Sequence, residues 1–500
     1  MKILDIFKKK KEILPHEYSF EGKVLDPNHL FFDCQNPELQ RTNTLSVNGI
    51  AHATTSSSPL IPNEFPNLYY LPYPLDSLLS GYNRVNAKNT YYHIKFDFKV
   101  GEAFTKDITT LYFTKLCGEY TIYLNGEKIL NDKNKLFVNA NVSKLINVGD
   151  NTLILTFKED KHEKIIGPSG PIYLESTPKN YIKSVSIKSD IKNEQVIFDI
   201  DAPNPSGLIS ITTPTAMHRE YNFKGNKVEI KLDNLILWTP DKPFFYQYSI
   251  NIDEGGDSVR GIFALLEYGI DNIDGVNAIT INNNPTPIKG ILDNYYYSDS
   301  LSLPPTVNHI KTLFSEIKSL GFNSIRKTNF VDIKDYYYNG LLKGLLIMQD
   351  ITFNGIDDLD NKIDYLKNFQ ALYLLNIILT DNKVNHKELY NYVKSKMPNK
   401  LISISLKGNK SYGDVSIKQN EFIGYSDFKK TPEEPFIANI KFENRVDGLK
   451  EFMDTKYIPS TMMGMVGFYY SSLNHIDDGL YNPSITKIRV KKSTVNDILK

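Results

Sequence analysis

The sequence predicts a multidomain chain: a β jelly roll, then an immunoglobulin-like β-sandwich, then a shortened (β/α)8 TIM barrel. Short strand-like segments separated by turn residues dominate up to about residue 275. Strand and helix patterns then alternate, which is typical of βα units in a parallel sheet. With 500 residues, of which 41% are hydrophobic, the chain is long enough to bury several cores. We place the predicted domains at 1–180, 181–275 and 276–500.

Three segments indicate strands in the first predicted domain. Residues 90–100 (TYYHIKFDFKV) alternate apolar and polar side chains, as a half-buried strand does. Residues 118–129 (GEYTIYLNGEKI) predict a hairpin, because Asn125-Gly126 is a strong two-residue turn signal. Residues 149–160 predict another turn followed by a strand. This spacing favours an antiparallel sandwich or jelly roll.

The second domain repeats this rhythm on a smaller scale. Its strand-like segments are 182–191, 194–201, 227–232 and 244–252. Trp238 is the only tryptophan of the chain and lies between the last two of them. We interpret it as a packing residue at a domain seam rather than a platform for a sugar ring.

The third domain offers enough strands for a barrel. The strand candidates are 288–294, 323–327, 345–351, 372–381, 401–408, 421–426, 435–442 and 464–472. Helical patterns fall between several of them, at 307–321, 333–344, 386–397 and 448–458. At about 225 residues the barrel is shorter than the roughly 250 that are typical, which predicts short loops.

Composition excludes several classes of protein. Lys+Arg and Asp+Glu both number 58, which argues against a general binder of nucleic acid or polyanions. Cys34 and Cys117 are too few for a disulfide scaffold or a cysteine-based zinc site. We find no metal-ligand cluster and expect no cofactor. The start of the chain lacks a signal-like apolar segment, and no apolar stretch reaches the ~18 residues of a membrane span. We therefore expect a cytoplasmic protein.

Several segments resemble parts of family-2 glycoside hydrolases, the β-galactosidase and β-glucuronidase group. They are residues 36–49 (NPELQRTNTLSVNG), 71–81, 119–129, 237–246 (LWTPDKPFFY), 281–300 and 320–355 (beginning LGFNSIRKTNF). In this order they cover most of the chain. The resemblance implies the same three-domain fold. It also implies a retaining mechanism with two glutamates, at the ends of barrel strands 4 and 7.

The positions that the resemblance assigns to these glutamates are altered here. On strand 4, Thr380 stands at the family's asparagine and Asp381 at its acid/base glutamate. On strand 7, either Ile440 or Lys441 stands at the nucleophile, depending on the residue used to align the segment. Neither can form the glycosyl ester that a retaining mechanism requires. Glu443 is the nearest carboxylate and fits only if the strand bulges.

Other positions match the family in part. Arg326 keeps the arginine of a motif after strand 2, whereas Thr328 replaces its histidine. Asp350 matches an acidic position after strand 3. In the strand-8 region, the residues that fit a sugar pocket are Tyr469, Asn474 and His475.

Each of these residues also has a structural interpretation. Asp381 is either a catalytic acid or a helix N-cap or strand-end residue. Arg326 is either a substrate contact or half of a core ion pair. Asp350 is either part of the functional site or a structural support. Lys441 is a candidate partner for Asp381 or Asp350 in a buried salt bridge.

Three functions follow, in order of preference. The first is a family-2-like protein that has lost hydrolysis and keeps a carbohydrate-binding or scaffolding role. The second is an active, divergent β-glycosidase that uses Asp381 and Glu443. The third is a structural or assembly protein, for which a homo-oligomer or a protein partner is expected.

Overall fold

The computed structural model describes residues 37–82, 84–85, 87–294, 296–297, 299–328, 330–406, 410–419, 435–440, 445–462 and 464–470, with the strand pairs 19–20 and 23–24. The chain forms two compact units. The first comprises residues 1–35, 41–179 and 296–309, and the second comprises residues 36–40, 180–295 and 310–500.

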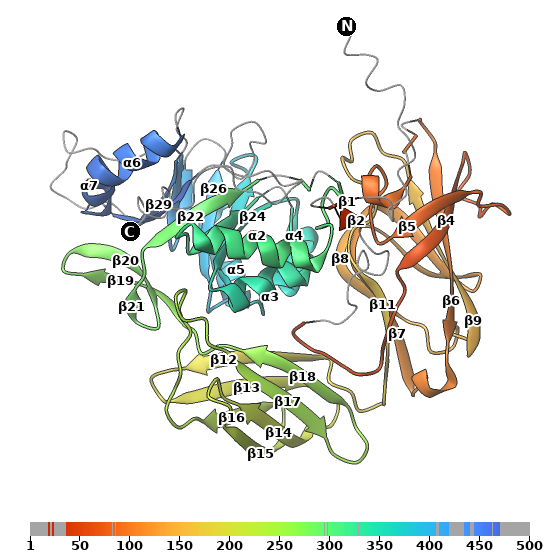
Figure 1. The fold of residues 1–500 in the computed structure, drawn as a ribbon, viewed down its shortest axis with the longest axis horizontal. Coiled ribbons are helices and arrows are strands. Elements are labelled where there is room, and N and C mark those ends of the chain that lie inside the picture. Colours follow the sequence, from red (N-terminus) through yellow and green to blue (C-terminus); the bar gives the residue numbers. More distant parts are fainter. Residues whose placement is uncertain are drawn as a thin grey trace, which may run out of the picture. The chain divides into compact units, whose positions relative to one another are not determined.

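The first unit is antiparallel β structure (Figure 1, red to orange). Its strands are β1 (Ser19–Phe20), β2 (Lys23–Val24), β3 (Thr44–Ser46), β4 (Gly49–Ser56), β5 (Asn67–Leu71), β6 (Tyr91–Val100), β7 (Ile108–Leu124), β8 (Glu127–Asn141), β9 (Gly149–Lys158), β10 (Gly167–Pro168) and β11 (Ile172–Thr177). Two short 3₁₀ helices, η3 (Leu78–Ser80) and η4 (Glu102–Phe104), lie between them. Nine strands join into one sheet in the order β3-β11-β7-β9-β6-β4-β5, with β8 and β10 also paired to β7.

The strand pattern of this unit was predictable from local signals. The turn between β7 and β8 is Asn125-Gly126, and both residues have positive φ, 51° and 89°. This conformation is the one that Asn and Gly tolerate best, and it confirms the predicted hairpin. The predicted strands at 90–100 and 149–160 are β6 and β9. The antiparallel β architecture is confirmed, whereas the jelly-roll arrangement stays a prediction.

A segment from the second half of the sequence belongs to the first unit. Residues 296–309 follow β22 in the chain and are held by side chains of the unit. The hydroxyl of Tyr73 donates to the carbonyl oxygen of Pro305 over 2.7 Å, and that of Ser77 donates to the carbonyl oxygen of Asp299 over 2.9 Å. The chain therefore leaves the second unit and returns to it around this segment.

The second unit begins with two small sheets that share one core. Their strands are β12 (Ser184–Asp190), β13 (Gln195–Asp201), β14 (Ser206–Thr212), β15 (His218–Lys224), β16 (Lys227–Lys231), β17 (Tyr246–Ile252) and β18 (Ser258–Phe263). The sheet orders are β12-β13-β16 and β15-β14-β17-β18. Phe198 of the first sheet meets Tyr248 and Phe263 of the second edge to face. A further sheet joins β19 (Tyr268–Ile273), β20 (Val276–Ile281) and β21 (Asn284–Pro285).

Trp238 has the packing role that the sequence suggested. Its side chain is fully buried, and its indole N–H donates to the carbonyl oxygen of Leu341 over 2.9 Å. A buried indole with a satisfied N–H fills space and fixes the segment that carries it.

A nine-stranded, mainly parallel sheet forms the rest of the second unit (Figure 1, green to blue). Its strands are β22 (Ile288–Asp293), β23 (Ser324–Lys327), β24 (Leu346–Thr352), β25 (Leu372–Leu379), β26 (Leu401–Leu406), β27 (Lys410–Gly413), β28 (Ser416–Gln419), β29 (Phe436–Ile440) and β30 (Met465–Tyr470). The order is β27-β26-β25-β24-β23-β22-β30-β29-β28, and only the ladder between β26 and β27 is antiparallel. In the described residues no ladder joins β26 to β28.

Helices connect most of these strands. They are α2 (Val307–Ser319), α3 (Lys334–Lys343), α4 (Ile356–Leu366), α5 (His386–Lys396), α6 (Arg445–Thr455) and α7 (Tyr457–Met462). The sequence did not predict α4, whose first turn holds Asp357 and Asp358 and so resembles a polar loop. It also did not predict β27 or β28. The strand predicted at 421–426 lies outside the described residues.

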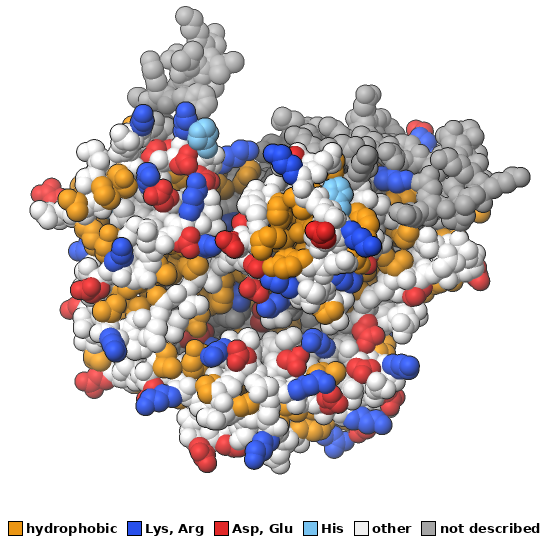
Figure 2. Space-filling model, turned by 180° about the vertical axis from the view of Figure 1, so that it is seen from behind, with side chains coloured by type: hydrophobic (Ala, Val, Ile, Leu, Met, Phe, Trp, Pro, Cys, Tyr) orange, Lys and Arg blue, Asp and Glu red, His pale blue; other side chains and the backbone are white. Residues whose placement is uncertain are grey.

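Charge is balanced over the molecule. In the view of Figure 2, acidic and basic side chains are interspersed, in agreement with a net charge of zero. None of the helices in the described part of the chain has the length and apolarity needed to cross a bilayer.

Candidate functional site

Strand register divides the side chains of the parallel sheet between its two faces. Paired residues on neighbouring strands point to the same side, and successive residues point to opposite sides. We call one side the inner face. It carries Gly290, Ser324, Arg326, Asp350, Asn376 and Tyr469.

A chain of polar contacts crosses four adjacent strands on the inner face. Arg326 on β23 donates from Nε and Nη2 to Oδ2 of Asp350 on β24, over 3.0 and 2.8 Å. Oδ1 of Asp350 accepts from Nδ2 of Asn376 on β25 over 3.0 Å. The hydroxyl of Ser405 on β26 donates to Oδ1 of Asn376 over 2.7 Å. Both carboxylate oxygens of Asp350 are therefore in use, and the buried charge is balanced.

A second cluster on the same face is built around Tyr469. Its hydroxyl lies 2.6 Å from Oγ of Ser324 and 2.9 Å from the hydroxyl of Tyr373. Burial raises the pKa of Tyr469, so the phenol is protonated at neutral pH. The ring lies against Gly290, where an added Cβ would be 2.3 Å from Cδ1 of Tyr469. Glycine at 290 is thus required by the close approach of this ring.

The opposite face of β23 carries a buried lysine. Nζ of Lys327 lies 3.0 Å from Oδ2 of Asp293 and 3.1 Å from Oδ2 of Asp332. Burial alone would lower the pKa of Lys327, but the two carboxylates outweigh burial and raise it. The hydroxyl of Tyr336 also donates to Asp293 over 2.7 Å. Consecutive residues of β23 therefore place two cations on opposite faces, Arg326 with one carboxylate partner and Lys327 with two.

Asp381 lies just beyond the C-terminal end of β25, on an exposed turn. Its side chain is 52% exposed, and Oδ2 is 3.7 Å from Nζ of Lys383. Oδ1 accepts the backbone N–H of Lys383 over 3.0 Å. The N-cap of α5 is Asn385, so the N-cap interpretation of Asp381 is wrong and the strand-end interpretation describes its position. Thr380 is exposed beside it.

The end of β29 is apolar at Ile440. This side chain is buried and pairs in register with Tyr470, whereas Asn439 pairs with Tyr469. Alternation therefore puts Asn439 on the inner face and Ile440 on the other. The remaining candidates, Lys441, Glu443, Asn474 and His475, lie outside the described residues.

The other sequence candidates fall into the networks above. Arg326, Asp350 and Tyr469 share the inner face, in line with the core ion-pair interpretation of Arg326. A substrate contact through Arg326 stays a prediction. Thr328 is half-buried, and its backbone N–H donates to the carbonyl oxygen of Asp293 over 3.0 Å.

Two members of these networks were missed from the sequence. Asn376 is the only polar residue in the apolar run 374–379, and an amide inside a buried strand signals a hydrogen-bond partner on a neighbouring strand. Lys327 gave the same signal, because a lysine in a strand of a parallel sheet that is buried on both faces must be paired with a carboxylate. Within the described residues, no group of three or more His, Cys, Asp or Glu side chains is placed to hold a metal ion.

Several solved structures resemble this chain in fold, and they are named as β-glucuronidases or a family-2 glycosyl hydrolase. The β-glucuronidase of Lactobacillus rhamnosus matches with a TM-score of 0.74 and 13% identity, over 94% of this chain and 98% of that one. The β-D-glucuronidase of Dictyoglomus thermophilum matches with a TM-score of 0.68 and 13% identity, over 93% and 98%. A glycosyl hydrolase family 2 member from Bacteroides cellulosilyticus matches with a TM-score of 0.66 and 12% identity, over 90% and 70%.

The sequence comparisons add no relative: no protein-family model matches the chain, and no curated protein matches it. At 12–14% identity, the structural likeness shows the fold. The chain has a fold like that of family-2 glycoside hydrolases, as its sequence motifs predicted.

Proposed function

We propose that this chain is a cytoplasmic protein of glycosidase fold in which hydrolysis is impaired, and which binds carbohydrate or serves as a scaffold. The likeness to β-glucuronidases supports the carbohydrate part of this proposal. The residues at the predicted catalytic positions support the loss of hydrolysis.

The proposal rests on one observation, which is that both carboxylate oxygens of Asp350 accept hydrogen bonds. Among the described strand residues of the inner face, Asp350 is the only carboxylate. Arg326 and Asn376 occupy its two oxygens. A carboxylate with both oxygens in buried hydrogen bonds to a cation and an amide is poorly suited to attack a sugar or to exchange a proton.

The other predicted positions fit the same proposal. A retaining glycosidase needs two carboxyl groups about 5–5.5 Å apart, on either side of the bond that breaks. Ile440 supplies no carboxyl group. Asp381 is exposed, and among the described residues its side chain contacts Lys383. Its position on a surface turn does not give the fixed geometry and the exclusion of water that a catalytic acid needs.

We further propose that the parallel sheet closes as a (β/α)8 barrel. Eight of its strands run parallel in one continuous order, and the two strands at the ends of that order, β26 and β28, approach each other. In such a barrel the inner face is the packed interior, and the C-terminal ends of the strands form the mouth.

An active, divergent β-glycosidase is the second candidate. It is favoured by the position of Asp381, a carboxylate at the C-terminal end of a parallel strand, where barrel enzymes place their chemistry. This alternative requires a nucleophile from another residue, for which Glu443 is the candidate.

Hydrolysis of a panel of aryl β- and α-glycosides distinguishes the two candidates. Wild type is compared with Asp381→Ala and with Asp364→Ala, a matched control whose carboxylate is also exposed and paired with a lysine, over 2.8 Å. We expect no turnover above background from any of the three, with folding checked by circular dichroism. Turnover by wild type and Asp364→Ala that falls in Asp381→Ala would overturn the proposal in favour of an active glycosidase.

A further inference from the structure

The second unit contains a large cleft that neither Asp381 nor Ile440 lines. Its volume is about 810 Å³. One side is formed by β12 and β13, and the other by residues 367–370 and 395–400. These two segments directly precede β25 and β26, so the cleft lies at the N-terminal edge of the parallel sheet. The predicted catalytic positions are at the other edge.

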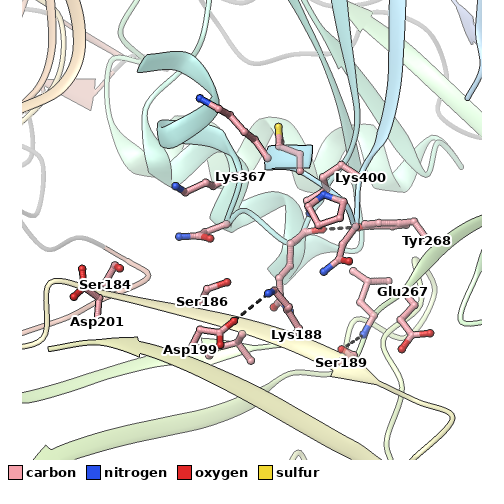
Figure 3. A pocket seen from close by; sticks show the side chains of 18 of the residues that line it. Ser184, Ser186, Lys188, Ser189, Asp199, Asp201, Glu267, Tyr268, Lys367 and Lys400 are labelled. Carbon is pink, nitrogen blue, oxygen red and sulfur yellow. Dashed lines mark hydrogen bonds and ion pairs between the residues drawn. The ribbon is translucent and has the colours of Figure 1, made fainter. Parts of the chain in front are cut away.

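The strand side of the cleft is polar. Ser184 pairs in register with Asp201, and Ser186 pairs with Asp199, so these four side chains share one face. They line the cleft, as Figure 3 shows. Lys188 continues this row and is neutralised by Asp199, which lies 3.0 Å away. Hydroxyl and carboxylate groups on one surface can hydrogen-bond the hydroxyl groups of a small ligand.

Lys400 lies in the opposite wall, and its environment differs from that of the other lysines of the cleft. Its side chain is 7% exposed. Nζ donates to the carbonyl oxygen of Phe369 over 2.7 Å and reaches that of Gln370 at 3.5 Å. The ring of Tyr268 lies 5.4 Å from Nζ, and Figure 3 shows both side chains at the cleft.

The other three lysines of the cleft have carboxylate partners. Lys188 pairs with Asp199, Lys367 with Asp364 at 2.8 Å and Lys396 with Asp360 at 2.6 Å. No described carboxylate lies within 4.0 Å of Nζ of Lys400. Its ammonium group is therefore buried against neutral carbonyl oxygens and the Tyr268 ring, without a carboxylate in contact, which penalises the charged form.

The chemistry of the amine follows from this environment. Burial lowers the pKa of Lys400 to about 7, with the Glu38 carboxylate acting in the opposite direction. In contrast, the hydrogen bond with Asp360 raises the pKa of Lys396. At pH 7 roughly half of the Lys400 amine then carries a free lone pair, whereas an ordinary lysine is almost fully protonated. A neutral amine in a wall of low polarity is the form that attacks carbonyl carbon.

We propose that Lys400 is an imine-forming site, and that the cleft accepts small hydroxylated aldehydes or ketones. Nζ forms a bond to the carbonyl carbon while the carbonyl π electrons move to oxygen, giving a carbinolamine. Loss of water then forms the C=N bond, and the carbonyl oxygen departs with the two hydrogens that the amine carried. The step needs no oxidant or reductant. The serine and aspartate row opposite is placed to hold the hydroxyl groups of the ligand. This site is independent of the proposed function.

Reductive trapping in the wild-type protein tests the proposal. The full chain is incubated with glyceraldehyde and cyanoborohydride between pH 6 and 9, and each lysine is quantified by peptide mass spectrometry. At pH 7.5 we expect Lys400 to be labelled about tenfold faster than Lys188, Lys367 or Lys396, because far more of it is neutral. Equal or slower labelling of Lys400 would overturn the proposal.

Two further measurements test whether the preferential labelling of Lys400 depends on the folded protein or only on the local sequence. In 8 M urea the preference for Lys400 is expected to vanish, and a preference that persists there would contradict a role for the fold. In folded Lys99→Arg, a change at an exposed lysine that does not line the cleft, labelling of Lys400 is expected to match wild type. A fall in Lys400 labelling in this variant would show that the label does not report the environment of Lys400.

Discussion

Arg326 and Asp350 form a two-point ion pair that is almost completely buried. The side chains are 5% and 4% exposed, and Nε and Nη2 of the arginine both donate to one oxygen of the carboxylate. Asn376 holds the other oxygen. Removing the two charges of such a pair from water costs a large free energy, which is offset only while both partners are present.

Removing one partner is therefore expected to destabilise the protein strongly. Asp350→Asn leaves the buried guanidinium of Arg326 without a counter-charge, which should cost about 3–5 kcal/mol of unfolding free energy. Urea denaturation measures this change. Glu229→Gln is the control, because its pair with Lys227 is exposed, at 49% and 60%, and should cost less than about 1 kcal/mol. Equal losses in both variants would contradict a buried ion pair.

Replacing both partners gives a separate expectation. Arg326→Met combined with Asp350→Leu removes both charges, and should be more stable than Asp350→Asn, since no buried charge is left unpaired. The same denaturation experiment measures the difference. A double variant that is less stable than Asp350→Asn would indicate that the polar network as a whole, including Asn376, holds these strands together.

Glycine at 290 is expected to be essential for packing. In Gly290→Ala the new methyl group would lie 2.3 Å from two ring carbons of Tyr469, so the ring must move away from Ser324. We expect a loss of about 1–3 kcal/mol. Gly101→Ala is the control, because no atom lies within 4 Å of its added Cβ. Adding Tyr469→Leu to Gly290→Ala should restore part of the loss, and failure to do so would locate the strain elsewhere.

Removal of Lys327 is expected to make the stability of the protein depend on pH. Lys327→Met leaves the buried Asp293 without its cation, and the pKa of Asp293 is already raised by burial in the wild type. A carboxyl group whose pKa is higher in the folded state than in the unfolded state makes the protein less stable as the pH rises above the unfolded pKa. The variant should thus lose more stability at pH 7 than at pH 4.5, measured by denaturation at both values. Lys327→Met with Asp293→Asn should reduce this difference.

Local signals were sufficient for much of the fold. Alternation in 90–100 and the Asn125-Gly126 turn depend on neighbouring residues, so the sequence carries them directly. The contacts of Arg326 do not depend on neighbouring residues, because its partner is 24 residues away and is determined by strand register. For the same reason the sequence left Arg326 open between a substrate contact and an ion pair. The acidic start of α4 hid that helix, because Asp favours both first turns and loops.

The buried amine of Lys400 gives the last prediction, on pH and stability. The folded pKa of about 7 is below the unfolded value of about 10.4, so between these values the unfolded chain binds a proton that the folded chain does not. Stability must then rise with pH across this window. Below pH 7 both states are protonated, and the folded state carries the full cost of a buried charge.

Lys400→Met removes that cost while keeping most of the apolar stem. It should be more stable than wild type by a few kcal/mol at pH 6, with an advantage that shrinks as pH rises from 7 to 10. Denaturation at pH 6, 8 and 10 measures the trend. Lys188→Met is the control, since its side chain is 43% exposed and paired with Asp199, and its effect should stay within about 1 kcal/mol at each pH. A pH-independent difference between Lys400→Met and wild type would show that the amine is not buried as a charge.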